Sequence, residues 1–156
     1  MQFSSKEDID APIEEVFAAI SDFDAFERSA IRRGIDVARV DEAAPVAPGM
    51  AWDAAFQLRG KSRDLHLVLS KMTAPEEMQI DSESSGLSGI MTVELVALSP
   101  RRTRLAIVLN LSPKTLSARL FLQSLKLAKT SLTKRFKVKV ADFAKSIEDK
   151  QATRTA

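Results

Sequence analysis

The chain has 156 residues, of which 45% are hydrophobic and 28% charged, and its formal net charge is +2 at pH 7. These values are typical of a soluble globular protein and argue against a disordered or fibrous chain. The chain contains no cysteine, which excludes a disulfide framework, a thiolate zinc site and a cysteine nucleophile.

The length and the ends of the chain lead to two further expectations. We expect a single domain over residues 1–148, followed by a flexible tail over residues 149–156. The first residues lack the apolar segment of a secretion signal, and no run of 18 uncharged apolar residues occurs. We therefore expect a cytoplasmic protein.

The small net charge hides an uneven distribution of charged residues. Residues 1–113 carry 12 Lys/Arg and 18 Asp/Glu, whereas residues 114–156 carry 11 and 3, so the two parts stand at −6 and +8. We interpret the basic part mainly as a solvated helix face, or as a surface matched internally by the acidic part. It could also attract an anionic membrane or an acidic partner.

The first predicted elements are a strand and two short helices. Residues 3–9 alternate loosely between apolar and polar types, which favours a strand. A helix is predicted to begin after Asp10 and to run through Ile20. Asp10 is a suitable N-cap, Pro12 fits the first helical turn, and two acidic residues follow it at the positive end of the helix dipole. A second helix is predicted over residues 24–31.

From residue 35 onward the apolar period changes to two, which indicates strands. The turns between the strands contain Gly, Pro and Ser. Six strands are predicted: at 35–40 and 50–58, and then around the alternating apolar residues of 65–69, 78–80, 91–95 and 105–111. Successive strands joined by short turns predict an antiparallel meander with one face exposed to water.

The last predicted element is one long amphipathic helix, from Pro113 to about Ile147. Its apolar residues recur in steps of three and four and so fall on one stripe: Phe121, Leu125, Ala128, Leu132, Phe136, Val140, Phe143 and Ile147. A helix of this length needs a partner surface, and the only large one available is a face of the sheet. We therefore predict a curved antiparallel sheet that grips this helix, with a cavity between them.

The stretch from Ile9 to Phe23 contains an Ala-Pro pair, two acidic residues and Val-Phe, and then leads to an Asp. It resembles a motif of the START-like superfamily, also known as SRPBCC or helix-grip proteins, which includes polyketide cyclase/dehydrase-like and lipid-transport members. The order of the predicted elements is similar to that superfamily over nearly the whole chain.

This resemblance implies an α+β helix-grip fold. In that fold a seven-stranded curved antiparallel sheet wraps around a long C-terminal helix, and two short helices lie between strands 1 and 2. It also implies a pocket for apolar or amphipathic small molecules. It does not fix the function, since enzymes, carriers and receptors share this framework.

The residues that would line such a pocket are those on the inward phase of the strands and on the helix stripe. The alternative for each apolar residue is that it simply packs in the core. Arg63 is the best candidate for an anionic head group, although Ser5 and Glu7 also fall on the inward phase. The candidate ligand-binding residues are Trp52, Phe56, Arg63, Leu67, Met91, Leu109, Phe121, Leu125 and Leu132.

The sequence offers little for catalysis. His66 is the only histidine and falls on the outward phase beside Asp64, so we interpret it as a surface residue. We expect no metal and no cofactor, because no acidic cluster has ligand spacing. The glycines at 86 and 89 lack the Lys and helix start of a phosphate loop. Exposed aromatics are not interleaved with the basic residues, so we expect no nucleic acid.

The function that we expect is the binding or transport of an apolar or amphipathic small molecule, lipid- or polyketide-like, in a cavity between the sheet and the C-terminal helix. One alternative is a cyclase- or dehydratase-like enzyme that uses the same cavity, with Arg63 or Glu7 as the polar participant. Another is a module that docks its basic helix on a membrane surface or a protein. That basic face would contain Arg119, Lys126, Lys134 and Lys137.

Overall fold

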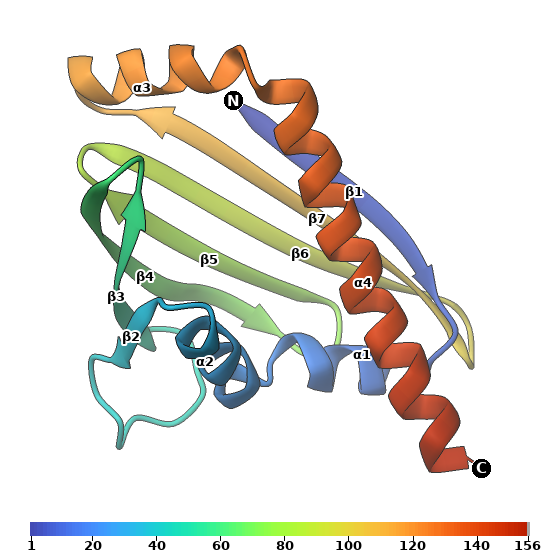
Figure 1. The fold of residues 1–156 in the computed structure, drawn as a ribbon. Coiled ribbons are helices and arrows are strands. Elements are labelled where there is room, and N and C mark those ends of the chain that lie inside the picture. Colours follow the sequence, from blue (N-terminus) through green and yellow to red (C-terminus); the bar gives the residue numbers. More distant parts are fainter. Residues whose placement is uncertain (156) are drawn as a thin grey trace.

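In residues 1–155, which the computed structural model describes, seven strands and four helices follow one another along the chain (Figure 1). The elements are β1 (Gln2–Ile9), α1 (Ile13–Ile20), α2 (Phe23–Arg32), β2 (Asp36–Arg39), β3 (Ala51–Leu58), β4 (Lys61–Thr73), β5 (Glu77–Ser84), β6 (Leu87–Ser99), β7 (Arg102–Pro113), α3 (Leu116–Lys126) and α4 (Lys129–Thr155).

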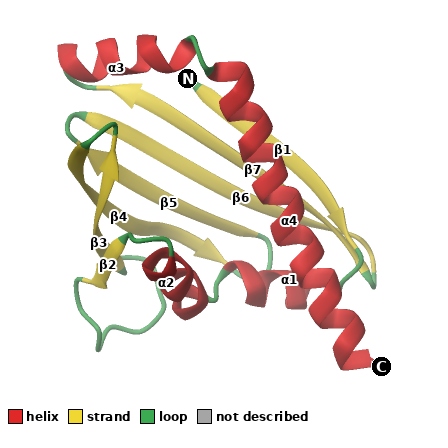
Figure 2. Cartoon of the chain, viewed as in Figure 1, coloured by secondary structure: helices red, strands yellow, loops and turns green. Residues whose placement is uncertain are grey.

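All seven strands form one antiparallel sheet with the spatial order β1-β7-β6-β5-β4-β3-β2. The strands from β2 to β7 are successive neighbours, and β1 closes the far edge by pairing with β7. Register shifts between Leu69 and Lys71 and between Ala97 and Ser99 mark bulges, which bend the strands. Figure 2 shows the curved sheet behind α4. The predicted α+β helix-grip fold is confirmed.

The tightly packed core lies at the end of the sheet that α1 covers. Ile9, Val16, Leu69, Met78 and Leu105 are almost completely buried there. They lie on the inward phase of their strands or on the inner face of α1, as the alternation predicts. Each such side chain contributes about 1.5–3 kcal/mol by leaving water. The side chains at this end of the molecule therefore pack against one another in a hydrophobic core.

The start of α1 differs from the prediction that Asp10 caps it. The N-cap residue is Pro12, in an extended conformation, and no side chain caps the helix. The Pro12 carbonyl accepts hydrogen bonds from the backbone N–H groups of Glu15 and Val16. Asp10 lies two residues before the N-cap position, and its carboxylate is instead 3.8 Å from Arg102.

The predicted single helix from Pro113 to Ile147 is divided into two helices, α3 and α4, and it begins after Pro113. β7 extends to Pro113, and Thr115 then caps α3 by accepting a hydrogen bond from the Ala118 N–H at 3.1 Å. The chain turns after α3, where the Ala128 N–H donates to the Leu125 carbonyl. In Figure 1, α3 crosses the end of the sheet and α4 runs at a large angle to it.

The second of these helices, α4, packs mainly against β1. It continues through Thr155, so the segment expected to be a flexible tail is helical as far as residue 155, while Ala156 lies outside the described residues. Within the described part of the chain, no helix combines the length and the apolar character needed to cross a bilayer.

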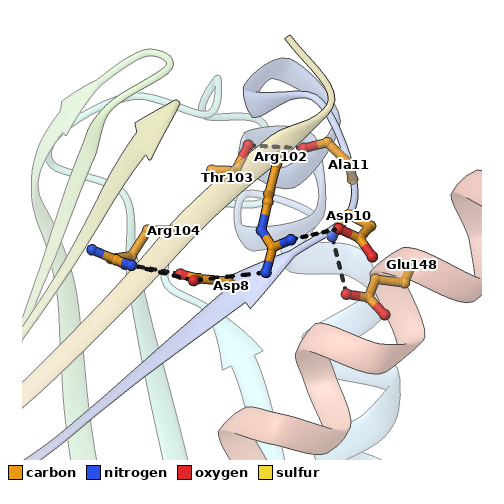
Figure 3. Close-up of polar contacts among 7 residues, drawn as sticks. All are labelled: Asp8, Asp10, Ala11, Arg102, Thr103, Arg104 and Glu148. Carbon is orange, nitrogen blue, oxygen red and sulfur yellow. Dashed lines mark hydrogen bonds and ion pairs between the residues drawn. The ribbon is translucent and has the colours of Figure 1, made fainter. Parts of the chain in front are cut away.

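A polar network joins β1, β7 and α4 near the packed end (Figure 3). Arg104 donates two hydrogen bonds to the Asp8 carboxylate, at 2.8 and 3.2 Å. Because of that hydrogen bonding, the pKa of Asp8 is lowered and the pKa of Arg104 is raised. The Asp10 N–H donates to Glu148 of α4 at 3.0 Å, and the buried Thr103 hydroxyl donates to the Ala11 carbonyl at 2.8 Å. The Asp10–Glu148 hydrogen bond is the contact of this network that connects α4 to the end of β1.

Candidate ligand-binding site

Two cavities lie on the concave side of the sheet. The larger one, called here the main cavity, has a volume of about 690 Å³ and lies between the sheet, α2 and α4. The smaller one, called the side cavity, has a volume of about 360 Å³ and lies between the sheet and α3. The site is described from these two cavities.

Nearly all the walls of the main cavity are apolar, because each strand turns alternate apolar residues toward it. Four ionisable residues of α2, α4 and their ends also border it: Glu27, Arg33, Lys139 and Asp142. The apolar lining consists of Ile20, Phe23, Phe26, Ala30, Val37, Trp52, Leu67, Met78, Ile80, Met91, Val93, Ile107, Phe136, Val140 and Phe143.

Two aromatic side chains of α2, Phe23 and Phe26, line the main cavity. The rings of Phe26 and Phe143 are 5.6 Å apart between centroids, so this pair connects α2 to α4. Phe23 packs against Trp52 at 5.1 Å. Phe26 is 43% exposed, which places the Phe26–Phe143 pair at the boundary between the cavity and solvent.

The side cavity combines apolar and polar walls. Phe56, Leu65, Leu111 and Phe121 contribute hydrocarbon surface. Its polar lining consists of Lys61, Arg63, Ser82, Ser84, Ser85 and Ser117. This mixture suits a polar group attached to an apolar body.

Arg63 is the most distinctive polar residue of the side cavity. Its guanidinium carbon lies 5.4 Å from the centre of the Phe121 ring, at cation–π distance. Its Nε atom is buried and has no hydrogen-bond partner among the described residues. A buried donor without a partner is costly, and an acceptor placed beside this atom would satisfy it.

Gly89 has no side chain, and this leaves space for the side chain of Ser82 in the wall of the side cavity. The Ser82 hydroxyl donates to the Gly89 carbonyl at 3.2 Å. A Cβ atom at position 89 would lie 2.5 Å from that hydroxyl oxygen. A side chain on this residue would therefore displace Ser82 and fill part of the cavity.

The two cavities follow one another along the same strands. On β4 the inward residue Leu67 lines the main cavity, and the preceding inward residue, Leu65, lines the side cavity. The same step occurs from Met91 to Gly89 on β6. Residues two apart on a strand are about 7 Å apart. The concave face thus passes from an apolar region to one that contains Arg63.

The structure divides the nine candidate ligand-binding residues into three groups. Trp52, Leu67 and Met91 line the main cavity. Phe56, Arg63 and Phe121 line the side cavity. The remaining three, Leu109, Leu125 and Leu132, line neither cavity and are half-buried.

Several cavity residues were not selected from the sequence. Ser82 and Ser84 continue the inward phase of Ile80, so strand parity could have identified them. Phe136 and Phe143 belong to the predicted helix stripe but were not chosen. Whether the α2 aromatics line a cavity depends on where α2 lies over the sheet, which the helix period alone does not give.

The other polar residues considered from the sequence lie outside these two cavities. His66 is exposed on β4, and its Nδ1 atom is 2.7 Å from Asp53 on the neighbouring strand. Both residues border an open depression of about 950 Å³. No group of side chains that could hold a metal ion occurs among the described residues. Glu7 lines neither the main nor the side cavity.

No protein-family model and no curated protein matches this chain. Solved structures do resemble it. A protein from Thermus thermophilus has a TM-score of 0.66 at 14% identity, with 100% of both chains covered. The Zhui aromatase/cyclase from a Streptomyces species has a TM-score of 0.65 at 11% identity, with 95% of this chain and 93% of that chain covered.

A START superfamily protein from Mycobacterium smegmatis is also similar, with a TM-score of 0.56 at 15% identity. The alignment covers 86% of this chain and 95% of that chain. At such low identities the likeness concerns the fold alone. Together with the sheet order and the C-terminal helix, it shows that the chain has the START-like helix-grip fold.

Proposed function

We propose that this protein binds an amphipathic small molecule, lipid- or polyketide-like, with an apolar body in the main cavity and a polar group near Arg63. The observation that carries the proposal is the main cavity itself. About 690 Å³ of space remains between the sheet and the helices, and the lining is mostly apolar. Volumes of this size are typical of small-molecule sites.

The walls of the main cavity favour an apolar occupant. Trp52, Met91 and Phe136 offer large hydrocarbon surfaces and few hydrogen-bonding groups. Water in such a space lacks the two to four polar partners that hold a buried water. Apolar ligand surface that leaves water gains about 25 cal/mol per Å². An aliphatic or aromatic body therefore binds here better than a polar one.

Arg63 supports the assignment of an anionic or hydrogen-bond-accepting group to the ligand. Its buried Nε has no partner among the described residues. A carboxylate or sulfonate oxygen would satisfy that donor and interact with the guanidinium charge. Because the side cavity follows the main cavity along β4 and β6, one elongated molecule could reach both.

We favour binding over catalysis in this cavity. One similar protein is described as an aromatase/cyclase, but catalysis would need an acid or base positioned at the reacting atoms. Arg33, Lys139 and Asp142 are exposed. Glu27 accepts a hydrogen bond from Arg39 at 2.8 Å. The ionisable groups around the main cavity are thus solvated or paired.

Two fluorescent probes test the proposal. 1-Anilinonaphthalene-8-sulfonate and N-phenyl-1-naphthylamine share an apolar body, but only the first carries an anion. We expect the wild-type protein to bind both. Arg63→Gln should weaken the binding of the sulfonate probe about tenfold or more, because a charged hydrogen bond is lost. It should change the binding of the neutral probe little.

Arg59→Gln is the matched control. Arg59 lies over the Phe121 ring at the same 5.4 Å as Arg63. It lines neither cavity, and it donates to Ser124 at 3.1 Å. This variant should leave both affinities unchanged. The proposal is overturned if neither probe binds the wild-type protein. Equal effects of the two substitutions on the sulfonate probe would remove Arg63 from the site.

A further inference from the structure

Helix α3 is apolar on two opposite faces. Ala118 and Leu122 are buried on the face toward the sheet. On the outer face, Leu116, Leu120 and Leu127 are 72%, 57% and 92% exposed. At 3.6 residues per turn these three leucines fall within about 40° of one another around the helix axis. We call them the leucine stripe.

Leu127 belongs to the stripe although α3 ends at Lys126. Its backbone keeps right-handed helical angles, with φ at −64° and ψ at −28°. The leucine side chain therefore continues the direction set by Leu116 and Leu120. Isolated apolar side chains on a surface are ordinary, but three leucines aligned on one short helix form a patch that calls for a partner.

The charged residues of the segment that contains the leucine stripe are all basic. The segment 114–141 contains eight Lys/Arg and no Asp/Glu. In the described part of the chain only one of these eight forms an ion pair, Lys114 with Glu83 at 2.6 Å. Arg119 and Lys126 lie on α3 itself and Lys129 begins α4. Internal matching therefore accounts for little of the positive charge that the sequence places here.

We infer that α3 docks on an anionic membrane surface, with the leucine stripe inserted at the interface and the neighbouring cations on lipid head groups. An amphipathic helix with an apolar stripe and flanking Lys/Arg has the composition that binds this way. The leucines supply the apolar contact, and the positive charges supply attraction to anionic lipid.

The charge argues against other occupants of this surface. A two-fold contact with a second copy would bring the two basic segments together, which like-charge repulsion disfavours. Nucleic acid would use the cations but would leave the leucines exposed. An anionic lipid surface uses both features, and it is the occupant to which the inference commits.

The inner face of α3 gives this docking a structural consequence. Ala118 and Phe121 line the side cavity, while the leucine stripe lies on the opposite face of the same helix. A membrane bound at the stripe would therefore be separated from the side cavity by one helix. The inference does not depend on the proposed ligand, because it rests on the outer face alone.

Vesicle cosedimentation tests the inference with the full chain. The vesicles contain either phosphatidylcholine alone or phosphatidylcholine with phosphatidylserine. We expect the wild type to bind the phosphatidylserine vesicles, more weakly as salt is raised. The triple variant Leu116→Gln/Leu120→Gln/Leu127→Gln should reduce the partition coefficient about tenfold or more.

The control triple variant Val40→Gln/Val96→Gln/Leu98→Gln removes apolar side chains of comparable exposure, 59%, 56% and 42%, from other parts of the surface. It should leave vesicle binding unchanged. A charge variant, Arg119→Gln/Lys126→Gln/Lys129→Gln, should weaken binding to the anionic vesicles about fivefold per charge. It should also flatten the dependence of binding on salt.

The inference is overturned if the leucine variant binds the anionic vesicles as well as the wild type does. It is also overturned if the wild type forms a dimer that the leucine variant abolishes, since the stripe would then belong to a second copy. Both results leave the fluorescent-probe experiment unaffected. The failure of one proposal can therefore be told from the failure of the other.

Discussion

Arg59 and Arg63 both place a guanidinium 5.4 Å from the centre of the Phe121 ring, but they use their remaining donors differently. Arg59 donates to Ser124 at 3.1 Å. Arg63 keeps a buried Nε without a partner among the described residues. A ring face attracts a cation without occupying its N–H groups. Phe121 can therefore hold Arg63 in the side cavity while leaving donors for a ligand.

The Asp8–Arg104 pair allows a prediction about pH. The hydrogen bond from Arg104 lowers the pKa of Asp8, so ionised Asp8 favours the folded state. That contribution is present at pH values above the unfolded pKa of Asp8 and is lost as the pH falls through the lower folded pKa. Arg104→Gln should raise the pKa of Asp8 toward its ordinary value, as measured by NMR titration of the Asp8 carboxyl carbon.

The control for this titration is Arg101→Gln. Arg101 is exposed on the turn before β7 and forms no ion pair within the described residues. Its loss should leave the titration of Asp8 almost unchanged. The stability difference between wild type and Arg104→Gln should disappear at the acid end, where Asp8 is protonated in both proteins. A difference that persists there would contradict the assigned cause.

At the scale of elements, the connection between β7 and α4 is where sequence analysis failed. The apolar stripe of α3 continues in phase into α4, since Leu125 and Leu132 are seven residues apart. The turn at Leu127 and Ala128 contains neither Gly nor Pro. The direction change follows from the end of the sheet, where α3 packs against β7. A periodicity argument contains no information about that boundary.

The β5–β6 turn supports the beginning of α3. The Lys114 N–H donates to the Gly86 carbonyl at 2.7 Å. Gly86 has φ of +77°, and a Cβ atom there would lie 2.5 Å from the Thr115 side chain. Thr115 in turn caps α3. The position of α3 thus depends on the absence of a side chain at residue 86.

Gly86→Ala should therefore destabilise the protein and loosen α3. A positive φ alone costs an alanine about 1–2 kcal/mol, and the contact with Thr115 adds to that cost. Gly60→Ala is the control, because Gly60 has φ of +76° but nothing within 4 Å of its Cβ position. Urea unfolding should show a larger loss for Gly86→Ala. Hydrogen exchange in α3 should accelerate only in that variant, and equal exchange in both would contradict the proposed support.

At the scale of the whole molecule, the main cavity exists because the helices pack at the two edges of the sheet. α4 packs along β1 at one edge, and α2 packs against β2 at the other. Among the ring contacts of the described residues, the Phe26–Phe143 pair is the one that connects α2 to α4 across the opening. The middle strands between them are left partly uncovered.

The alternation of residues predicted which side chains face inward, and this was enough to predict the sheet and some of the residues that line the two cavities. It could not separate packed from hollow regions, because Leu105 and Met91 carry the same inward pattern. The first is buried in the core and the second borders the main cavity. The difference arises from where the helices lie, which no single strand encodes.

The difference between packed and hollow regions predicts that similar substitutions lower the stability of the protein by unequal amounts. Leu105→Ala should destabilise the protein by about 2–5 kcal/mol, because it creates a void in the packed end. Met91→Ala should cost less, since its side chain already borders empty space and loses fewer contacts. Urea unfolding of the two variants, each compared with wild type at one pH, measures both costs. Similar losses would mean that the concave face is packed uniformly around Met91, and the space assigned to a ligand would then belong to the core.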